Sequence, residues 1–117
     1  MANQGAIAEQ FVGQELLAYA NPYQEGELFF WEREQRSSAA EVDFVVQIKG
    51  HIIPIEVKAG HTGRLKSLHI FMQENSSPLG IRISQKPLEF DGSILTLPFY
   101  LISQLERLVS LCLEKSQ

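Results

Sequence analysis

The stretch EVDFVVQIKGHIIPIEVK, residues 41–58, decides the expected fold of this chain. Two runs rich in β-branched residues flank Lys49-Gly50, and a two-residue loop that contains glycine is a standard connection of a β-hairpin. If Lys49-Gly50 is the loop, Ile48 faces His51, and this pair sets the register of both strands. The sequence therefore predicts an antiparallel hairpin.

Three charged residues, Asp43, Glu56 and Lys58, interrupt these otherwise apolar strands. In the expected register Asp43 lies directly opposite Glu56, with Cβ atoms about 4.5–5.5 Å apart. Lys58 projects on the same side as Glu56, because residues two apart in a strand share a face. Two opposed carboxylates repel each other, so the pair indicates a cation between them or a shared proton. Mg²⁺ is a suitable cation, since it is usually held by one or two carboxylates together with waters and substrate phosphates.

The opposite face of the hairpin is apolar and is expected to be the buried one. A one-residue slip would bury the charges and expose the aliphatic side chains, so this face fixes the register. An alternative stays open: Asp43 and Glu56 as ordinary solvent-facing residues, with Lys58 as their surface salt-bridge partner. The apolar face comprises Phe44, Val46, Ile48, Ile53, Ile55 and Val57.

These residues resemble a family. Asp43, a gap of twelve residues and then Glu56-Val57-Lys58 look like the PD-(D/E)XK signature of restriction-endonuclease-like nucleases, with Val42 in place of the usual proline. More specifically, Gly5 to Tyr100 is similar to the C-terminal domain of a group of bacterial and archaeal AAA-type ATPases. That domain is of unknown function and is usually assigned a PD-(D/E)XK-like fold. The motifs that carry the resemblance are FVGQELL (11–17), FWER (30–33), EVDFVV (41–46) and IPIEVKAG (53–60).

The resemblance implies a site as well as a fold. It makes Asp43 and Glu56 ligands of Mg²⁺ or Mn²⁺, and it makes Lys58 the group that orients the attacking water or steadies the scissile phosphate. Glu15 matches an acidic position on the first helix that often completes such a site, as a further metal ligand. The implied activity is hydrolysis of phosphodiester bonds in nucleic acid, with DNA as the expected substrate.

The residues around Glu15 have helical spacing from Ala6 to about Tyr19. Ile7, Phe11 and Glu15 fall at i, i+4 and i+8, so Glu15 extends an apolar stripe. A carboxylate on an inward face is unusual unless it is paired or bound to metal. The alternative is a boundary residue at the edge of the stripe.

The rest of the chain fits an α/β layout, which the resemblance narrows to a restriction-endonuclease-like mixed central β-sheet flanked by helices. Periodicity and turn residues predict strands, helices and turns on both sides of the hairpin. Pro54 is in conflict with a central strand, because proline cannot donate to a ladder. The expected elements are a strand at 28–34, a helix near 64–75, strands at 79–84 and 94–97 with a turn around 91–92 between them, and a helix at about 101–113.

Length and composition bound the class of protein. With 117 residues, the chain is expected to form one domain over 1–117, and the resemblance makes it the C-terminal part of a longer ATPase. It has no apolar run long enough to cross a membrane and no signal-peptide pattern, so a soluble cytoplasmic protein is expected. The single cysteine, Cys112, is expected to be a small buried hydrophobic residue. The oligomeric state is left open.

Two interpretations from different classes remain. The first is a metal-dependent nuclease domain attached to the ATPase. The second is a non-catalytic binding or regulatory module that uses a nuclease-like fold to dock a partner or the ATPase. A net charge of −4 argues against a strong free-standing binder of nucleic acid. A basic set stays possible in Arg33, Arg36, Lys58, Arg64 and Lys66, although a plain solvated surface is favoured for Arg36, Arg64 and Lys66.

Overall fold

The computed structural model describes residues 4–19, 29–32, 41–59 and 65–115, with the backbone alone for 29–32. These residues form a mixed sheet of six strands in the order β1-β2-β3-β4-β6-β5. The elements in chain order are α1 (Gln4–Tyr19), β1 (Phe29–Glu32), β2 (Phe44–Ile48), β3 (His51–Val57), α2 (Lys66–Glu74), β4 (Gly80–Ser84), β5 (Glu89–Phe90), β6 (Ile94–Pro98), the 3₁₀ helix η2 (Phe99–Gln104) and α3 (Leu105–Lys115).

The β2–β3 hairpin has the predicted register. Ile48 pairs with His51 and Phe44 pairs with Ile55. The loop residues Lys49 and Gly50 have φ angles of 51° and 80°. Positive φ at both central positions is the conformation of a type I′ turn, whose twist matches that of the flanking strands.

The sheet is antiparallel on one side of β3 and parallel on the other. β3 pairs with β4 in parallel from Ile55 onward, and β4 pairs with β6 in parallel. Pro54 lies just before the parallel pairing begins, so the N–H group that it lacks falls outside the β3–β4 ladder. This register removes the conflict between Pro54 and a central strand.

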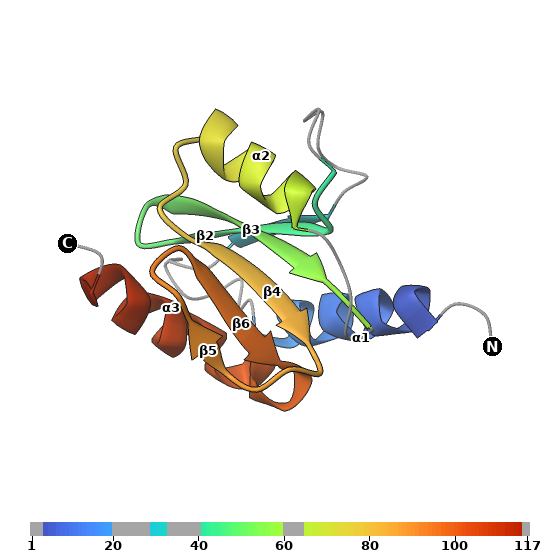
Figure 1. Cartoon of the computed structure of the whole chain (residues 1–117). Coiled ribbons are helices and arrows are strands. Elements are labelled where there is room, and N and C mark those ends of the chain that lie inside the picture. The colour runs from blue at the N-terminus through green and yellow to red at the C-terminus, as the bar shows by residue number, and fades with distance from the viewer. Residues whose placement is uncertain (1–3, 20–28, 33–40, 60–64, 116–117) are drawn as a thin grey trace.

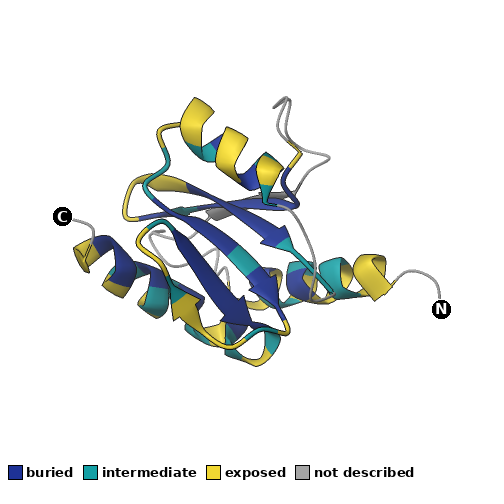
Figure 2. Ribbon diagram, in the orientation of Figure 1, coloured by how far each residue is buried: buried dark blue, intermediate teal, exposed yellow. Residues whose placement is uncertain are grey.

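Helices cover both faces of the sheet, which confirms the mixed α/β class. Figure 1 shows α2 on one side of the sheet and α1 and α3 on the other. The larger core cluster contains α1, α3 and the expected apolar face of the hairpin, including Phe44 and Ile55. The smaller cluster joins α2 to Val42, Val45 and Ile94. In Figure 2 the strands are mostly buried, whereas the helices carry exposed residues on their outer sides.

Cys112 belongs to the larger cluster and is buried. Burial raises the pKa of its thiol, because an apolar environment disfavours the thiolate. This confirms the expected small hydrophobic residue.

Three element predictions needed correction. The C-terminal segment is a 3₁₀ helix followed by α3, where one continuous helix was expected. The two-residue strand β5 was not predicted, because so short a segment has no readable alternation. The helix α1 buries Val12 and Leu16, whereas Ile7 and Phe11 are exposed. The expected inward stripe through Ile7, Phe11 and Glu15 is therefore wrong.

The turn between β5 and β6 is held by Asp91. Its Oδ1 accepts hydrogen bonds from the N–H groups of Ser93 at 2.9 Å and Ile94 at 2.7 Å. Gly92 takes a φ of 102°, which glycine adopts without strain. The bond from Ile94, followed by that from Ser93, holds the pKa of the Asp91 carboxyl below its ordinary value of 3.8.

We expect Asp91→Ala to lower the free energy of unfolding at neutral pH by at most about 1 kcal/mol, because this carboxylate is exposed to solvent. A carboxyl whose pKa is lower in the folded state stabilises the fold above its unfolded pKa, and that stabilisation disappears as the pH falls through the folded value. The difference between parent and variant should therefore shrink as the pH falls below 3.8. Denaturation curves at several pH values measure this difference, and Asp91→Asn, which keeps an acceptor oxygen, should lose less. A difference that is constant with pH would contradict the assignment.

Candidate functional site

Asp43 and Glu56 lie beside the end of the hairpin ladder. The paired residues end at Phe44 and Ile55, and Asp43 directly precedes Phe44 while Glu56 directly follows Ile55. Asp43 is 4% exposed and Glu56 is 6% exposed. The alternative of ordinary solvent-facing residues is therefore wrong for both carboxylates.

The carboxylate of Asp43 takes the place of a backbone carbonyl at this end of the sheet. If the ladder continued, the N–H of Val57 would meet the carbonyl of Val42. Instead, Asp43 Oδ2 accepts the hydrogen bond from Val57 N at 2.8 Å, and the N–H of Asp43 donates to Ile55 O at 3.1 Å. Val42 and Val45 both belong to the cluster beneath α2, although strict alternation would place them on opposite faces. The strand is thus irregular at Asp43, and its carboxylate completes the hydrogen bonding of β3.

Glu56 lies in a row of polar residues that crosses the sheet. It pairs with Arg82 of β4, Arg82 pairs with Thr96 of β6, and Thr96 pairs with Glu89 of β5. Directly paired residues project on the same face, so these side chains follow one another across the strands. The row carries one predicted metal ligand, Glu56, and a cation that the sequence did not single out, and Asp43 lies beside the hairpin pair next to Glu56.

Arg82 is the residue that was missed. Its Nε and Nη2 donate to Thr96 Oγ1 at 3.3 and 2.9 Å. A signal was available, because a single charge between two isoleucines in 81–83 repeats the pattern of Glu56 between Ile55 and Val57. The repeated pattern indicated a second charged position within an apolar strand.

Lys58 is half-buried and directly follows β3. Its N–H donates to Ile83 O at 2.9 Å, which extends the parallel pairing with β4 beyond Val57. Lys58 therefore follows Glu56 by two positions on an extended backbone, as predicted. Of the other members of the suggested basic set, Lys66 is exposed at the start of α2, and Arg33, Arg36 and Arg64 lie outside the described residues.

Glu15 is half-buried on α1, and one of its carboxylate oxygens accepts a hydrogen bond of 3.4 Å from the hydroxyl of Tyr19. The carboxylate that continues the buried face of this helix is Glu9, which precedes Val12 by three positions and Leu16 by seven. The role of Glu15 as a metal ligand stays a prediction, and its bond to Tyr19 does not strengthen it.

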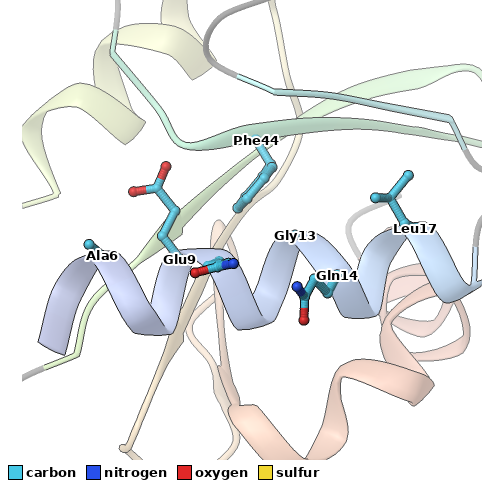
Figure 3. A pocket seen from close by; sticks show the side chains of 7 residues that line it. Ala6, Glu9, Gly13, Gln14, Leu17 and Phe44 are labelled. Atoms are coloured by element: carbon cyan, nitrogen blue, oxygen red, sulfur yellow. The ribbon is translucent and has the colours of Figure 1, made fainter. Parts of the chain in front are cut away.

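Glu9 borders a pocket of about 350 Å³ between α1 and β2, together with Gly13 and Phe44. Figure 3 shows the ring of Phe44 reaching from β2 toward Gly13, with the side chain of Glu9 rising from the helix beside it. A methyl group on Gly13 would lie 3.2 Å from Phe44 Cζ, so the missing side chain lets the ring sit close to the helix. The spacing of Glu9 from Val12 was the sequence signal that could have identified this side of α1.

Asp43 and Glu56 would supply part of the set of oxygen ligands that a hard divalent cation needs. Asp43 and Glu56 offer two buried carboxylates, and one or two carboxylates with waters and phosphate oxygens suit Mg²⁺. Within the described ranges, no group of three or more His, Cys, Asp or Glu side chains is placed to hold a metal ion. A site here would thus use Asp43 and Glu56, with the remaining positions filled by water and substrate.

Comparison with known proteins adds one finding. The family model described as "Domain of unknown function (DUF4143)" matches residues 4–102, which is more than half of the chain. No curated protein and no solved structure gave a significant match. Among the described helices, none is long and apolar enough to span a bilayer.

Proposed function

Because this chain belongs to the DUF4143 family, whose function the family description leaves open, we propose a function from its site: a metal-dependent nuclease domain that hydrolyses phosphodiester bonds. One observation carries the proposal. Two buried carboxylates, Asp43 and Glu56, lie beside the last pair of the β2–β3 ladder, and Lys58 follows Glu56 by two residues. The resemblance of these motifs to the PD-(D/E)XK nucleases supports the same activity and attachment to an AAA-type ATPase.

The chain's own residues have distinct roles in this proposal. Asp43 and Glu56 would hold Mg²⁺ or Mn²⁺, which when bound supplies Lewis acidity toward a phosphoryl oxygen and toward water. Lys58 places a positive charge where negative charge develops on the phosphate during hydrolysis. The bond from Val57 N to Asp43 Oδ2 fixes the orientation of the carboxylate before a substrate arrives.

A second candidate is the non-catalytic binding or regulatory module, and two observations favour it. The carboxylate of Asp43 has a structural task, because it accepts the N–H of Val57. Glu56 lies beside the cation of Arg82, so a metal ion is not the only positive charge near it. Both buried carboxylates would therefore have reasons to persist in a domain without catalysis.

Calorimetric titration of Mg²⁺ and Mn²⁺ separates the two candidates. We expect saturable binding by the parent and at least about tenfold weaker binding by Asp43→Asn and Glu56→Gln, because each variant removes one anionic ligand. Glu89→Gln is the matched control, since Glu89 is an exposed carboxylate at the other end of the same polar row. The control should bind metal as the parent does.

The opposite results are equally informative. A parent that shows no saturable binding at millimolar metal would favour the non-catalytic module. The same conclusion follows if Glu89→Gln loses binding as strongly as Glu56→Gln, because that loss would reflect general surface charge. Thermal unfolding of each variant shows whether a loss of binding follows a loss of fold.

A further inference from the structure

Arg82 occupies a part of the sheet face that α2 leaves accessible. Two positions earlier in the same strands, Gly80 and Ile94 lie beneath α2: a methyl group on Gly80 would meet Met72 Sδ at 2.7 Å, and Ile94 packs in the α2 cluster. Arg82 is only half-buried, so α2 covers less of the sheet at the polar row. The guanidinium can therefore be reached from solvent.

The hydrogen bonds of Arg82 point away from Glu56. Nε and Nη2 both donate to the Thr96 hydroxyl on the β6 side. A guanidinium carries five N–H donors, and the structure gives Arg82 no other hydrogen bond among the described residues. A residue that served only to neutralise Glu56 would direct its paired donors at that carboxylate. Thr96 thus engages two of the five donors of Arg82, and the other three make no hydrogen bond within the described part of the chain.

The charges around Arg82 suit an anionic ligand once a divalent cation is bound. In formal charges, the two carboxylates Asp43 and Glu56 are matched by the two cations Lys58 and Arg82. A divalent cation gives this group a net positive charge, which attracts a phosphodiester. The planar guanidinium of arginine matches the oxygens of a phosphate better than an ammonium group does.

We propose that Arg82 is a phosphate-binding residue, which contacts the backbone of a nucleic-acid strand that lies across the face of Asp43, Glu56 and Lys58. The proposal rests on the proposed nuclease function and adds a substrate contact to it. Thr96 is a positioning residue in this arrangement, because it holds the guanidinium on the β6 side and keeps it from closing on Glu56.

The test is binding of a short fluorescent oligonucleotide by the whole chain, measured by anisotropy at several salt concentrations with Mg²⁺ present. Phosphorothioate linkages make the probe resistant to hydrolysis, and single-stranded and duplex forms are both used. We expect Arg82→Gln to bind about tenfold more weakly, since a hydrogen bond to a charged group is lost. The slope of log affinity against log salt should fall by about 0.7 for the single strand and about 0.9 for the duplex.

Two variants control for charge and for fold. Arg107→Gln changes the net charge equally, but Arg107 lies on α3 and donates to Gln104, so binding should stay at the parental level. Thr96→Val removes the hydrogen bond to Arg82 and keeps the guanidinium, so its salt slope should match that of the parent. The proposal is overturned if Arg82→Gln binds as the parent does, or if Thr96→Val loses as much slope as Arg82→Gln.

Failure of this inference differs from failure of the proposed function. A parent that binds Mg²⁺ and the probe, with no change in Arg82→Gln, overturns the role of Arg82 alone. A parent that binds neither metal nor probe overturns both proposals. A parent that binds the probe through Arg82 but binds no metal keeps the phosphate contact and overturns the nuclease.

Discussion

Ile55→Ala is expected to lower the free energy of unfolding by about 2–5 kcal/mol, the range for truncating a large aliphatic side chain in a packed core. Ile55 is 0% exposed and lies between Phe44 of β2 and Ile81 of β4. Its removal would leave a cavity where the antiparallel and parallel parts of the sheet meet. Urea denaturation followed by circular dichroism measures the change, provided that the slope with denaturant stays constant.

Ile52 provides a matched control for this prediction. It lies in the same strand and carries the same side chain, but it is 40% exposed. We expect Ile52→Ala to change the free energy of unfolding by less than about 1 kcal/mol. Equal losses in the two variants would contradict the packing described for β3. The milder Ile55→Val should lose about 0.5–1.5 kcal/mol and leave Mg²⁺ affinity unchanged, because Ile55 projects away from the face of Glu56.

The hairpin was predictable because two independent signals agree. The Lys49-Gly50 turn and the apolar alternation both require the register in which Phe44 meets Ile55, and the structure has that register. Parallel pairing of β3 with β4 was not predictable in the same way, because it joins segments that are separated by α2. The position of Pro54 was informative only after that pairing was known.

The buried face of α1 shows why local periodicity is insufficient for the site. Ile7 with Phe11 and Val12 with Leu16 both have helical spacing, so two stripes compete in the sequence. Packing against Phe44 and the rest of the larger cluster selects the second stripe. That choice turns Glu9 toward the sheet and leaves Glu15 with Tyr19, which no pattern within the helix could decide.

The site itself was predictable only in part. Asp43, Glu56 and Lys58 followed from the hairpin, since their positions depend on one local register. The burial of both carboxylates depends on α2 and on β4, and the row through Arg82 and Thr96 depends on three separate strand pairings. Because such contacts are non-local, the sequence could indicate a charge between two isoleucines without showing what lies next to it.

Asp43→Ala is expected to destabilise the fold by about 1–2 kcal/mol, because it leaves a half-buried backbone donor without its acceptor. The donor is Val57 N, which lies 2.8 Å from Asp43 Oδ2 and has no ladder carbonyl in its place. Asp43→Asn should recover most of this loss, since the amide oxygen can accept the same bond. Denaturation of the two variants in the absence of divalent metal measures the structural contribution alone.

The same pair of variants separates structure from metal binding at one position. Asp43→Asn keeps an acceptor for Val57 but removes the negative charge, so it should fold nearly as the parent does and bind Mg²⁺ weakly. Asp43→Ala should be less stable to denaturation than the parent and should also bind Mg²⁺ weakly. If Asp43→Asn binds Mg²⁺ with parental affinity, then Asp43 serves the end of the β2–β3 ladder and is not a metal ligand. A parental stability of Asp43→Ala would instead show that the bond to Val57 contributes nothing to the fold.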